Sequence, residues 1–168
     1  MIFLKTLAHT LLIPGTVLAL VPYLILRDRD PALFELDTWT LSGSLWVLAG
    51  ILIGSWCTFE FMTRGSGTPN PLDPPKVLMH RGLYRYVRNP MYVSVAFILL
   101  GETLFFRSVA LAIYSAVLLI GIHFLVVLYE EPILERRFGE RYSGYRKRVP
   151  RWVPRSRAAQ QDDEADRP

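Results

Sequence analysis

The sequence predicts an all-α, polytopic integral membrane protein with four transmembrane helices. Apolar residues make up 51% of the 168 residues and fall into long runs. Gly and Pro clusters separate these runs. With four spans, both termini and the middle loop lie on the same side of the membrane, and most basic residues are on that side. A hydrocarbon core about 30 Å thick needs roughly 20 mostly apolar residues as a helix. The predicted spans are residues 2–26, 41–62, 91–106 and 108–129.

The first run also has a feature of a secretory signal, because Lys5 provides a basic flank. Its apolar length exceeds a usual signal core, and no small-x-small cleavage site lies near Pro22. We therefore favour a retained span, which Pro14 and Pro22 are expected to kink.

The second run carries small side chains that would let another helix approach closely. These are Gly43, Ala49, Gly50, Gly54 and Ser55. Glu60 lies one turn before the end of this run, and it is either a functional acid of the span or an interfacial group that pairs with Arg64. Cys57, the one cysteine, is interpreted as a small buried residue, so no internal disulfide is possible.

The third and fourth runs predict a tight antiparallel hairpin, because only Arg107 and Ser108 separate them. The third run spans about 24 Å as a helix, less than the hydrocarbon thickness. Glu102 lies near the tip of this hairpin, close to Arg107 in sequence. We interpret Glu102 as an interfacial ion and not as a proton relay.

After the fourth run, Pro132 disfavours a helical conformation at Glu131, so a break is expected there, with a new helix beginning at Pro132. This helix is predicted to be basic, amphipathic and interfacial, with a weak point at Gly139. Its apolar face would consist of Leu134, Phe138, Tyr142 and Tyr145. Residues 1–154 would then form a single domain, and residues 155–168 a disordered polar tail.

The distribution of basic residues predicts the orientation. Sixteen of the 19 Lys and Arg residues lie on the side that holds both termini and the 64–90 segment. The positive-inside rule places that side in the cytoplasm. The net charge of +4 therefore reflects topology and contact with anionic lipid headgroups, and not nucleic-acid binding.

Residues 80–92, HRGLYRYVRNPMY, are the strongest candidate for chemistry. Asn89 can cap a helix and Pro90 suits its first position, so the free N–H groups of that helix would face an anionic ligand group. The hairpin brings this stretch to the same end as Glu130 and Glu131, so the two patches can share a site for a zwitterionic or cationic ligand. The alternative is an ordinary interfacial belt of Arg and Tyr.

The segments YRYVRNPMYVS and EEPILERRFGERYSGYRKRVP resemble the isoprenylcysteine carboxyl methyltransferase family and, more distantly, the phospholipid N-methyltransferases. The likeness covers residues 76–150 and implies an integral membrane enzyme that binds S-adenosylmethionine on its cytoplasmic side. It implies no metal. Together with His80 and Arg88 from the basic stretch, the expected cofactor-binding residues are Lys76, Val77, Leu78, Met79, Tyr84, Asn89, Pro90, Met91, Tyr92 and Glu130.

Two positions depart from the family pattern. Asn89 replaces the usual His, and Val126 stands where the prenylcysteine branch has an Arg that recognises the substrate carboxylate. His123 lies seven residues before Glu130 on the same helix face, and is either a substrate-side catalytic residue or ordinary packing. Glu131 or His123 would accept a proton if the acceptor were an amine.

The expected activity is methyl transfer to a hydrophobic or lipid-like acceptor within the bilayer. Phospholipid amine methylation is the alternative within enzymes. Two alternatives are not enzymes: a four-helix transporter that uses Glu60 or Glu102, and a membrane scaffold. A transporter would concentrate charge at mid-membrane, which this sequence does not do. Neither the acceptor nor the oligomeric state follows from the sequence.

Overall fold

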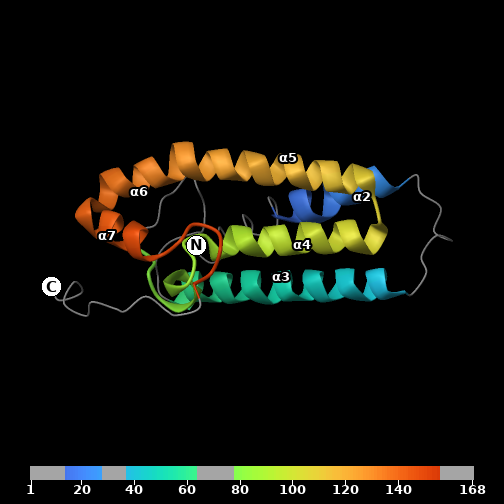
Figure 1. Ribbon diagram of the computed structural model, residues 1–168, viewed down its shortest axis with the longest axis horizontal. Coiled ribbons are helices and arrows are strands. Elements are labelled where there is room, and N and C mark those ends of the chain that lie inside the picture. Colours follow the sequence, from blue (N-terminus) through green and yellow to red (C-terminus); the bar gives the residue numbers. More distant parts are fainter. Residues whose placement is uncertain (1–13, 28–36, 64–77, 156–168) are drawn as a thin grey trace.

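The computed structural model describes residues 14–27, 37–63 and 78–155, and the regular elements in these ranges are all helical (Figure 1). In chain order the elements are η1 (Thr16–Leu20), α2 (Val21–Leu26), α3 (Thr38–Thr63), η3 (Gly82–Arg85), α4 (Pro90–Phe106), α5 (Val109–Leu125), η4 (Val126–Glu130), α6 (Glu131–Phe138) and α7 (Glu140–Arg148). Helix α4 lies between α3 and α5, while η1 contacts α4 and α2 contacts α5.

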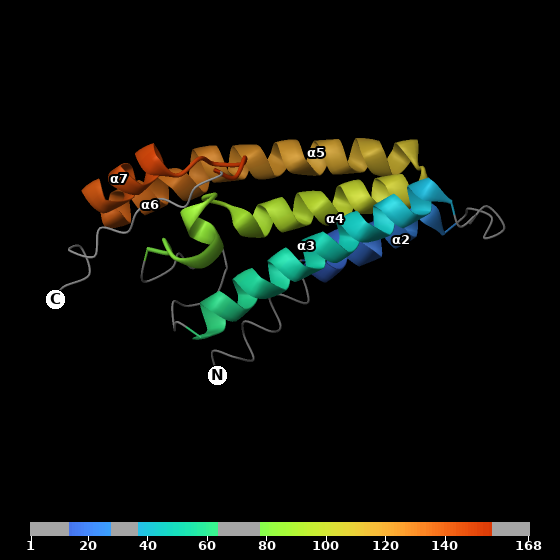
Figure 2. The same cartoon turned by 60° about the horizontal axis from the view of Figure 1, so that its bottom comes forward.

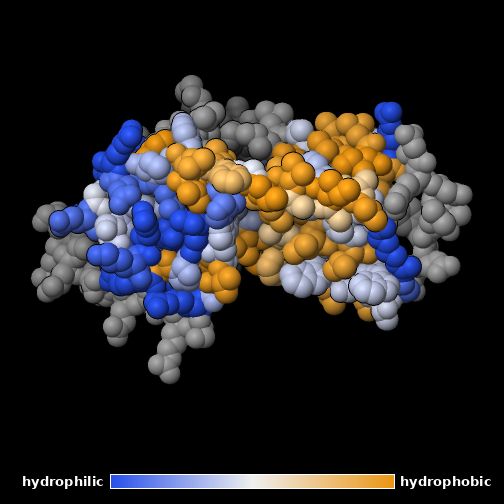
Figure 3. Space-filling model, turned by 45° about the horizontal axis from the view of Figure 1, so that its top comes forward, coloured by the Kyte–Doolittle hydropathy of each residue, from blue (hydrophilic) through white to orange (hydrophobic). Residues whose placement is uncertain are grey.

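Within the described part of the chain, two helices are long and apolar enough to cross a membrane, namely Thr38–Glu60 and the continuous helix Val109–Phe138. The apolar helices Thr16–Leu26 and Pro90–Phe106 are shorter. Large apolar side chains are exposed along α3 and α5, and Figure 3 shows apolar residues over the helices with polar residues gathered at the α6–α7 end. The all-helical fold is thus confirmed for the described residues, and crossing by the two shorter helices stays a prediction.

Small residues bring α3 and α4 into close contact. A Cβ atom added at Gly101 would lie 2.7 Å from the carbonyl oxygen of Gly43 and 2.7 Å from the backbone nitrogen of Val47. A Cβ atom added at Gly50 would likewise lie 2.8 Å from the carbonyl oxygen of Ser94. The predicted close approach is therefore confirmed for Gly43 and Gly50. For Ser55 it is wrong, because this side chain lies on the exposed side of α3.

The predicted tight hairpin between α4 and α5 is confirmed. Arg107 adopts the left-handed conformation (φ +46°) and ends α4. The hydroxyl of Ser108 then accepts a hydrogen bond from the backbone N–H of Leu111 (3.3 Å) and caps α5. Arg107 also forms an ion pair with Asp37, which caps the start of α3 through the N–H of Thr40 (3.0 Å).

The expected break at Glu131 is wrong, since the helix continues from Val109 to Phe138 with helical dihedral angles at Glu130 and Glu131. The π-helical turn η4 ends at Glu130, two residues before Pro132, and η1 ends at Leu20, two residues before Pro22. A π-helical turn shifts the backbone hydrogen-bond partners, which accommodates a proline that lacks an N–H and crowds the preceding turn. Both prolines are therefore absorbed into continuous helices.

A single interfacial helix after Pro132 is also a wrong prediction. Gly139 has φ +54° and ψ −128°, a backbone conformation suited to glycine, and it separates α6 from α7. Helix α7 folds back beside α6 (Figure 1). The four side chains expected to rest on the membrane surface, Leu134, Phe138, Tyr142 and Tyr145, instead form a cluster inside the protein together with Leu78 and Val149.

Candidate functional site

The candidate site lies at the end of the bundle where residues 78–89 run between the C-terminal end of α3 and the α6–α7 pair (Figure 2). The 80–92 stretch and the Glu130/Glu131 pair, which the sequence predicted to meet, do meet here. Tyr92, in the first turn of α4, donates a hydrogen bond from its hydroxyl to Oε1 of Glu130, at the end of η4. Both residues are half-buried.

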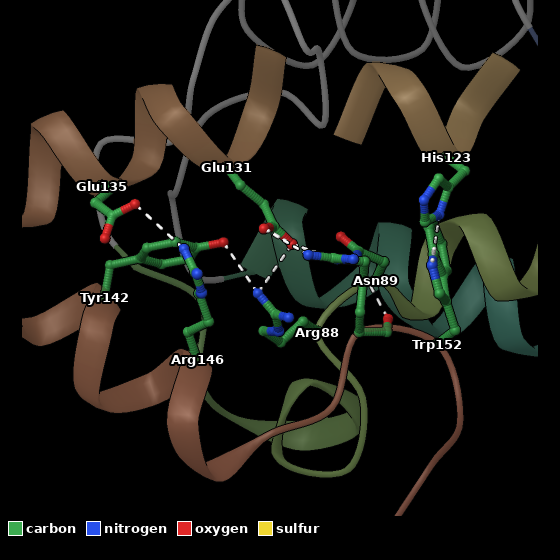
Figure 4. Close-up of polar contacts among 9 residues, drawn as sticks. Arg88, Asn89, His123, Glu131, Glu135, Tyr142, Arg146 and Trp152 are labelled. Carbon is green, nitrogen blue, oxygen red and sulfur yellow. Dashed lines mark hydrogen bonds and ion pairs between the residues drawn. The ribbon is translucent and has the colours of Figure 1, made fainter. Parts of the chain in front are cut away.

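Beside this contact lies a buried ionic cluster around Glu131, whose exposure is 5%. Nη1 of Arg88 donates to Glu131 Oε1 (3.0 Å) and to the hydroxyl of Tyr142 (3.4 Å), as Figure 4 shows. Arg151 binds the same carboxylate with two nitrogens, Nε to Oε1 (2.6 Å) and Nη2 to Oε2 (2.9 Å). The hydrogen bond to Glu131 raises the pKa of Arg151 above its usual range, so the guanidinium stays charged.

Tyr84 lies in η3, in the loop that leads to the site. Its side chain is 8% exposed and packs with Met79, and its carbonyl oxygen accepts a hydrogen bond from the hydroxyl of Tyr145 (2.7 Å). Burial, with a smaller contribution from neighbouring groups that include Glu60, raises the pKa of Tyr84 well above its usual range. Tyr84 is therefore a neutral residue that fixes the loop conformation.

Asn89 occupies the N-cap position of α4, but its side chain makes no capping hydrogen bond, which corrects the prediction. Its Nδ2 instead donates to the carbonyl oxygen of Arg151 (3.3 Å). Pro90 is buried at the first helical position, as predicted. The side chain of Asn89 thus leaves the first-turn N–H groups of α4 uncapped, which keeps them suitable for an anionic group.

The remaining cofactor candidates that the structure describes lie before η3 or in the first turn of α4. Leu78 packs against the α7 cluster, and Nδ1–H of His80 donates to the carbonyl oxygen of Leu78 (3.0 Å). Met91 is half-buried in the first turn of α4. Lys76 and Val77 lie outside the described residues.

His123 makes a contact that its sequence position did not predict. Trp152 donates a hydrogen bond from its indole N–H to Nδ1 of His123 (3.1 Å), and Figure 4 shows this pair beside the Glu131 cluster. A neutral ring that accepts at Nδ1 carries its proton on Nε2. His123 would have to release Trp152 to accept a proton at Nδ1, so its catalytic role stays a prediction.

Two residues of this region were not predicted as site residues, and the role of a third, Glu60, was left open. Arg151 was counted only among the basic residues of the C-terminal region and Trp152 was not considered, since no spacing links them to Glu131 or His123. Glu60 carried a usable signal, because Gly43, Gly50 and Cys57 recur every seven residues on the buried face of α3 and Glu60 follows one turn later. Glu60 is 4% exposed, and its carboxylate lies directly against Gly82.

This contact gives a testable prediction. A Cβ atom added at Gly82 would overlap the Glu60 carboxylate, and Gly82 also has φ +56°. We expect Gly82→Ala to destabilise the fold by about 2 kcal/mol or more, because left-handed backbone strain adds to the overlap. Gly82→Ala in a Glu60→Ala background, compared with Glu60→Ala alone, is the matched control, since it keeps φ +56° at position 82 and removes the carboxylate that the added Cβ would meet. Thermal unfolding in detergent measures both, and equal losses would show that Glu60 does not restrict position 82.

The sequence was also compared with models of protein families. The family model of phospholipid methyltransferases (PEMT) matches residues 39–141. The match runs from α3 to the first residues of α7, so it contains Arg88, Tyr92, Glu130 and Glu131. No curated protein and no solved structure matches the chain. The resemblance to membrane methyltransferases is thereby confirmed at the level of the family, without selecting the isoprenylcysteine branch. Because the match covers well over half of the sequence, the chain belongs to the phospholipid methyltransferase family.

Proposed function

We propose that the protein transfers a methyl group from S-adenosylmethionine to the amine of a phospholipid headgroup at the cytoplasmic face of a membrane. The observation that carries this proposal is the contact of Tyr92 with Glu130 inside the family-matched residues. This contact places a carboxylate beside an aromatic ring at the polar end of an apolar helix bundle. Such a setting suits a cationic ligand group.

The residues of the site fit the cofactor by the chemistry of their polar groups. S-adenosylmethionine carries a carboxylate, an ammonium, a ribose diol, an adenine and a sulfonium. The uncapped start of α4 suits the carboxylate. Nε of Arg88 is buried without a hydrogen-bond partner among the described residues, and so adds a second donor for an anionic group. Glu130 suits the ammonium or the ribose hydroxyls.

The mechanism asks the protein mainly for alignment and exclusion of water. When bound, S-adenosylmethionine supplies an electrophilic methyl group. Glu130 hydrogen-bonds to the neutral phenol of Tyr92, whereas Glu131 already binds two arginines. Glu130 is therefore the carboxylate that we assign to a cationic ligand, where it fixes the position of the reacting centre. Proton acceptance by Glu131 or His123 stays a prediction, because each would first have to release its present partner.

The environment of Val126 favours an amine over a carboxylate acceptor. Val126 is 1% exposed in η4, one turn before Glu130, so this position offers no charge to an acceptor. A prenylcysteine carboxylate would lack the arginine that the prenylcysteine branch provides there. A headgroup amine needs no positive partner, so the apolar side chain at position 126 is compatible with it. Carboxyl methylation of a prenylcysteine remains the second candidate, because the RNPMY and EE segments resemble that family.

The choice of acceptor is a prediction that a direct assay decides. Purified protein in mixed micelles would receive S-adenosylmethionine with a radiolabelled methyl group and either phosphatidylethanolamine or an S-farnesylcysteine acid. We expect the extracted label to favour the phospholipid by about tenfold or more, since an unpaired buried charge weakens binding of the wrong acceptor. Label found mainly in a base-labile methyl ester would instead support carboxyl methylation. A reaction without protein provides the blank for both arms.

A further inference from the structure

We propose that residues 149–155, here named the C-terminal strap, hold residues 84–89 in their binding conformation, and that Arg151 is the positioning residue through which they act. The inference rests on the proposed function, since it concerns the same site. The strap lies after the last family-matched residue, so the family match does not assign it a role.

Backbone hydrogen bonds fasten the strap to this loop at both of its ends. The N–H of Arg88 donates to the carbonyl oxygen of Pro150 (2.9 Å), and the N–H of Arg155 donates to the carbonyl oxygen of Tyr86 (3.0 Å). Between them, the side chain of Asn89 donates to the carbonyl oxygen of Arg151 (3.3 Å). The strap thus runs along the segment that leads into α4.

The side chain of Arg151 joins this backbone contact to the helix that carries Glu130. Its two nitrogens bind both oxygens of Glu131, and Glu131 Oε1 also accepts from Arg88. The side chains of Arg88 and Glu131 are only 9% and 7% exposed, so each depends on its partners for compensation of its buried charge. Arg151 thereby ties the loop residue Arg88 to α6 through one shared carboxylate.

Two further contacts fix the strap itself. Val149 is 1% exposed and packs against Tyr142 and Tyr145 of α7. Trp152 donates to His123 on α5. Because Glu130 directly precedes Glu131, a strap that holds the Arg88–Glu131 pair also holds the start of α4 against Glu130. Loss of Arg151 should therefore weaken cofactor binding more than it slows the chemical step.

The test compares Arg151→Ala and Arg151→Lys with wild type in detergent. Two properties are measured: the Kd for S-adenosylmethionine by calorimetry, and amide hydrogen exchange of peptides that cover residues 84–92 in the ligand-free protein. For Arg151→Ala we expect the Kd and the KM for the cofactor to rise about tenfold with kcat within about twofold, since a bidentate charged contact is lost. Exchange in the 84–92 peptides should be faster. Arg151→Lys should restore only part of both properties, because an ammonium does not reproduce the two-nitrogen contact.

Arg146→Ala is the matched control, since Arg146 pairs with Glu135 in the same α6–α7 region through side chains that are 46% and 50% exposed. It should leave the Kd and the exchange unchanged. Unchanged Kd and exchange in Arg151→Ala would overturn the proposal, as would a fall in kcat with exchange unaltered. If wild type does not bind S-adenosylmethionine, the proposed function is wrong, but the role of the strap is still tested. The hydrogen-exchange comparison uses the ligand-free protein, so it decides by itself whether the strap holds the loop.

Discussion

Replacing Glu130 by Gln should raise the Kd for S-adenosylmethionine roughly 10- to 100-fold and reduce methyl transfer at low cofactor concentration by the same factor. Gln keeps the size of the side chain but removes the negative charge that faces a cationic ligand. It also replaces the acceptor of the Tyr92 hydroxyl by a neutral amide. Calorimetry in detergent measures the affinity, and radiolabelled methyl transfer measures the activity.

Two controls define the source of this loss. Tyr92→Phe removes the hydroxyl that donates to Glu130 but leaves the carboxylate in place, so we expect a smaller rise in Kd, about tenfold or less. Glu102→Gln changes an acid in the last turn and a half of the same helix, far along α4 from Tyr92. It should leave affinity and activity unchanged. If Glu102→Gln abolished function and Glu130→Gln did not, the assignment of the site would be wrong and a transporter would be favoured.

The meeting of the two functional patches could be predicted because one short turn determines it. With only Arg107 and Ser108 between α4 and α5, both open ends of the hairpin must lie on the same side, whatever the details of the packing. The small residues of α3 were equally informative, because a helix that places Gly43 and Gly50 on one face can be approached closely only there. Extending that seven-residue spacing by one turn would also have placed Glu60 inside.

The errors arose where tertiary contacts outweigh local preference. Pro132 lowers the helical preference of Glu131 in an isolated chain, but the π-helical turn and the two arginines on Glu131 keep this residue helical. Gly139 was expected only to weaken a helix, yet its turn lets the apolar faces of α6 and α7 bury each other. The contact of Arg151 with Glu131 joins residues twenty positions apart with no periodic pattern, so sequence spacing carried no signal for it.

Replacing Gly101 by Leu should destabilise the fold most strongly, because the neighbours of an added Cβ include backbone atoms of the facing helix. The added atom would lie 2.7 Å from the carbonyl oxygen of Gly43 and from the backbone nitrogen of Val47. No rotamer change relieves such contacts, so α3 and α4 must separate. We expect a loss of about 3 kcal/mol or more and a fall of roughly 10 °C in the midpoint of thermal unfolding, measured in detergent.

Gly121→Leu is the matched control for this variant. Gly121 is exposed on α5, and an added Cβ there has nothing within 4 Å. The same substitution at position 121 should therefore leave the unfolding midpoint within about 2 °C of wild type. Equal midpoints for the two variants would mean that α3 and α4 do not approach as closely as these glycines require. Helix α3 also carries Glu60, whose carboxylate lies against Gly82 in the loop before α4. Separation of α3 from α4 should therefore loosen this loop. We expect Gly101→Leu to lose cofactor binding even below its unfolding temperature, while Gly121→Leu retains it.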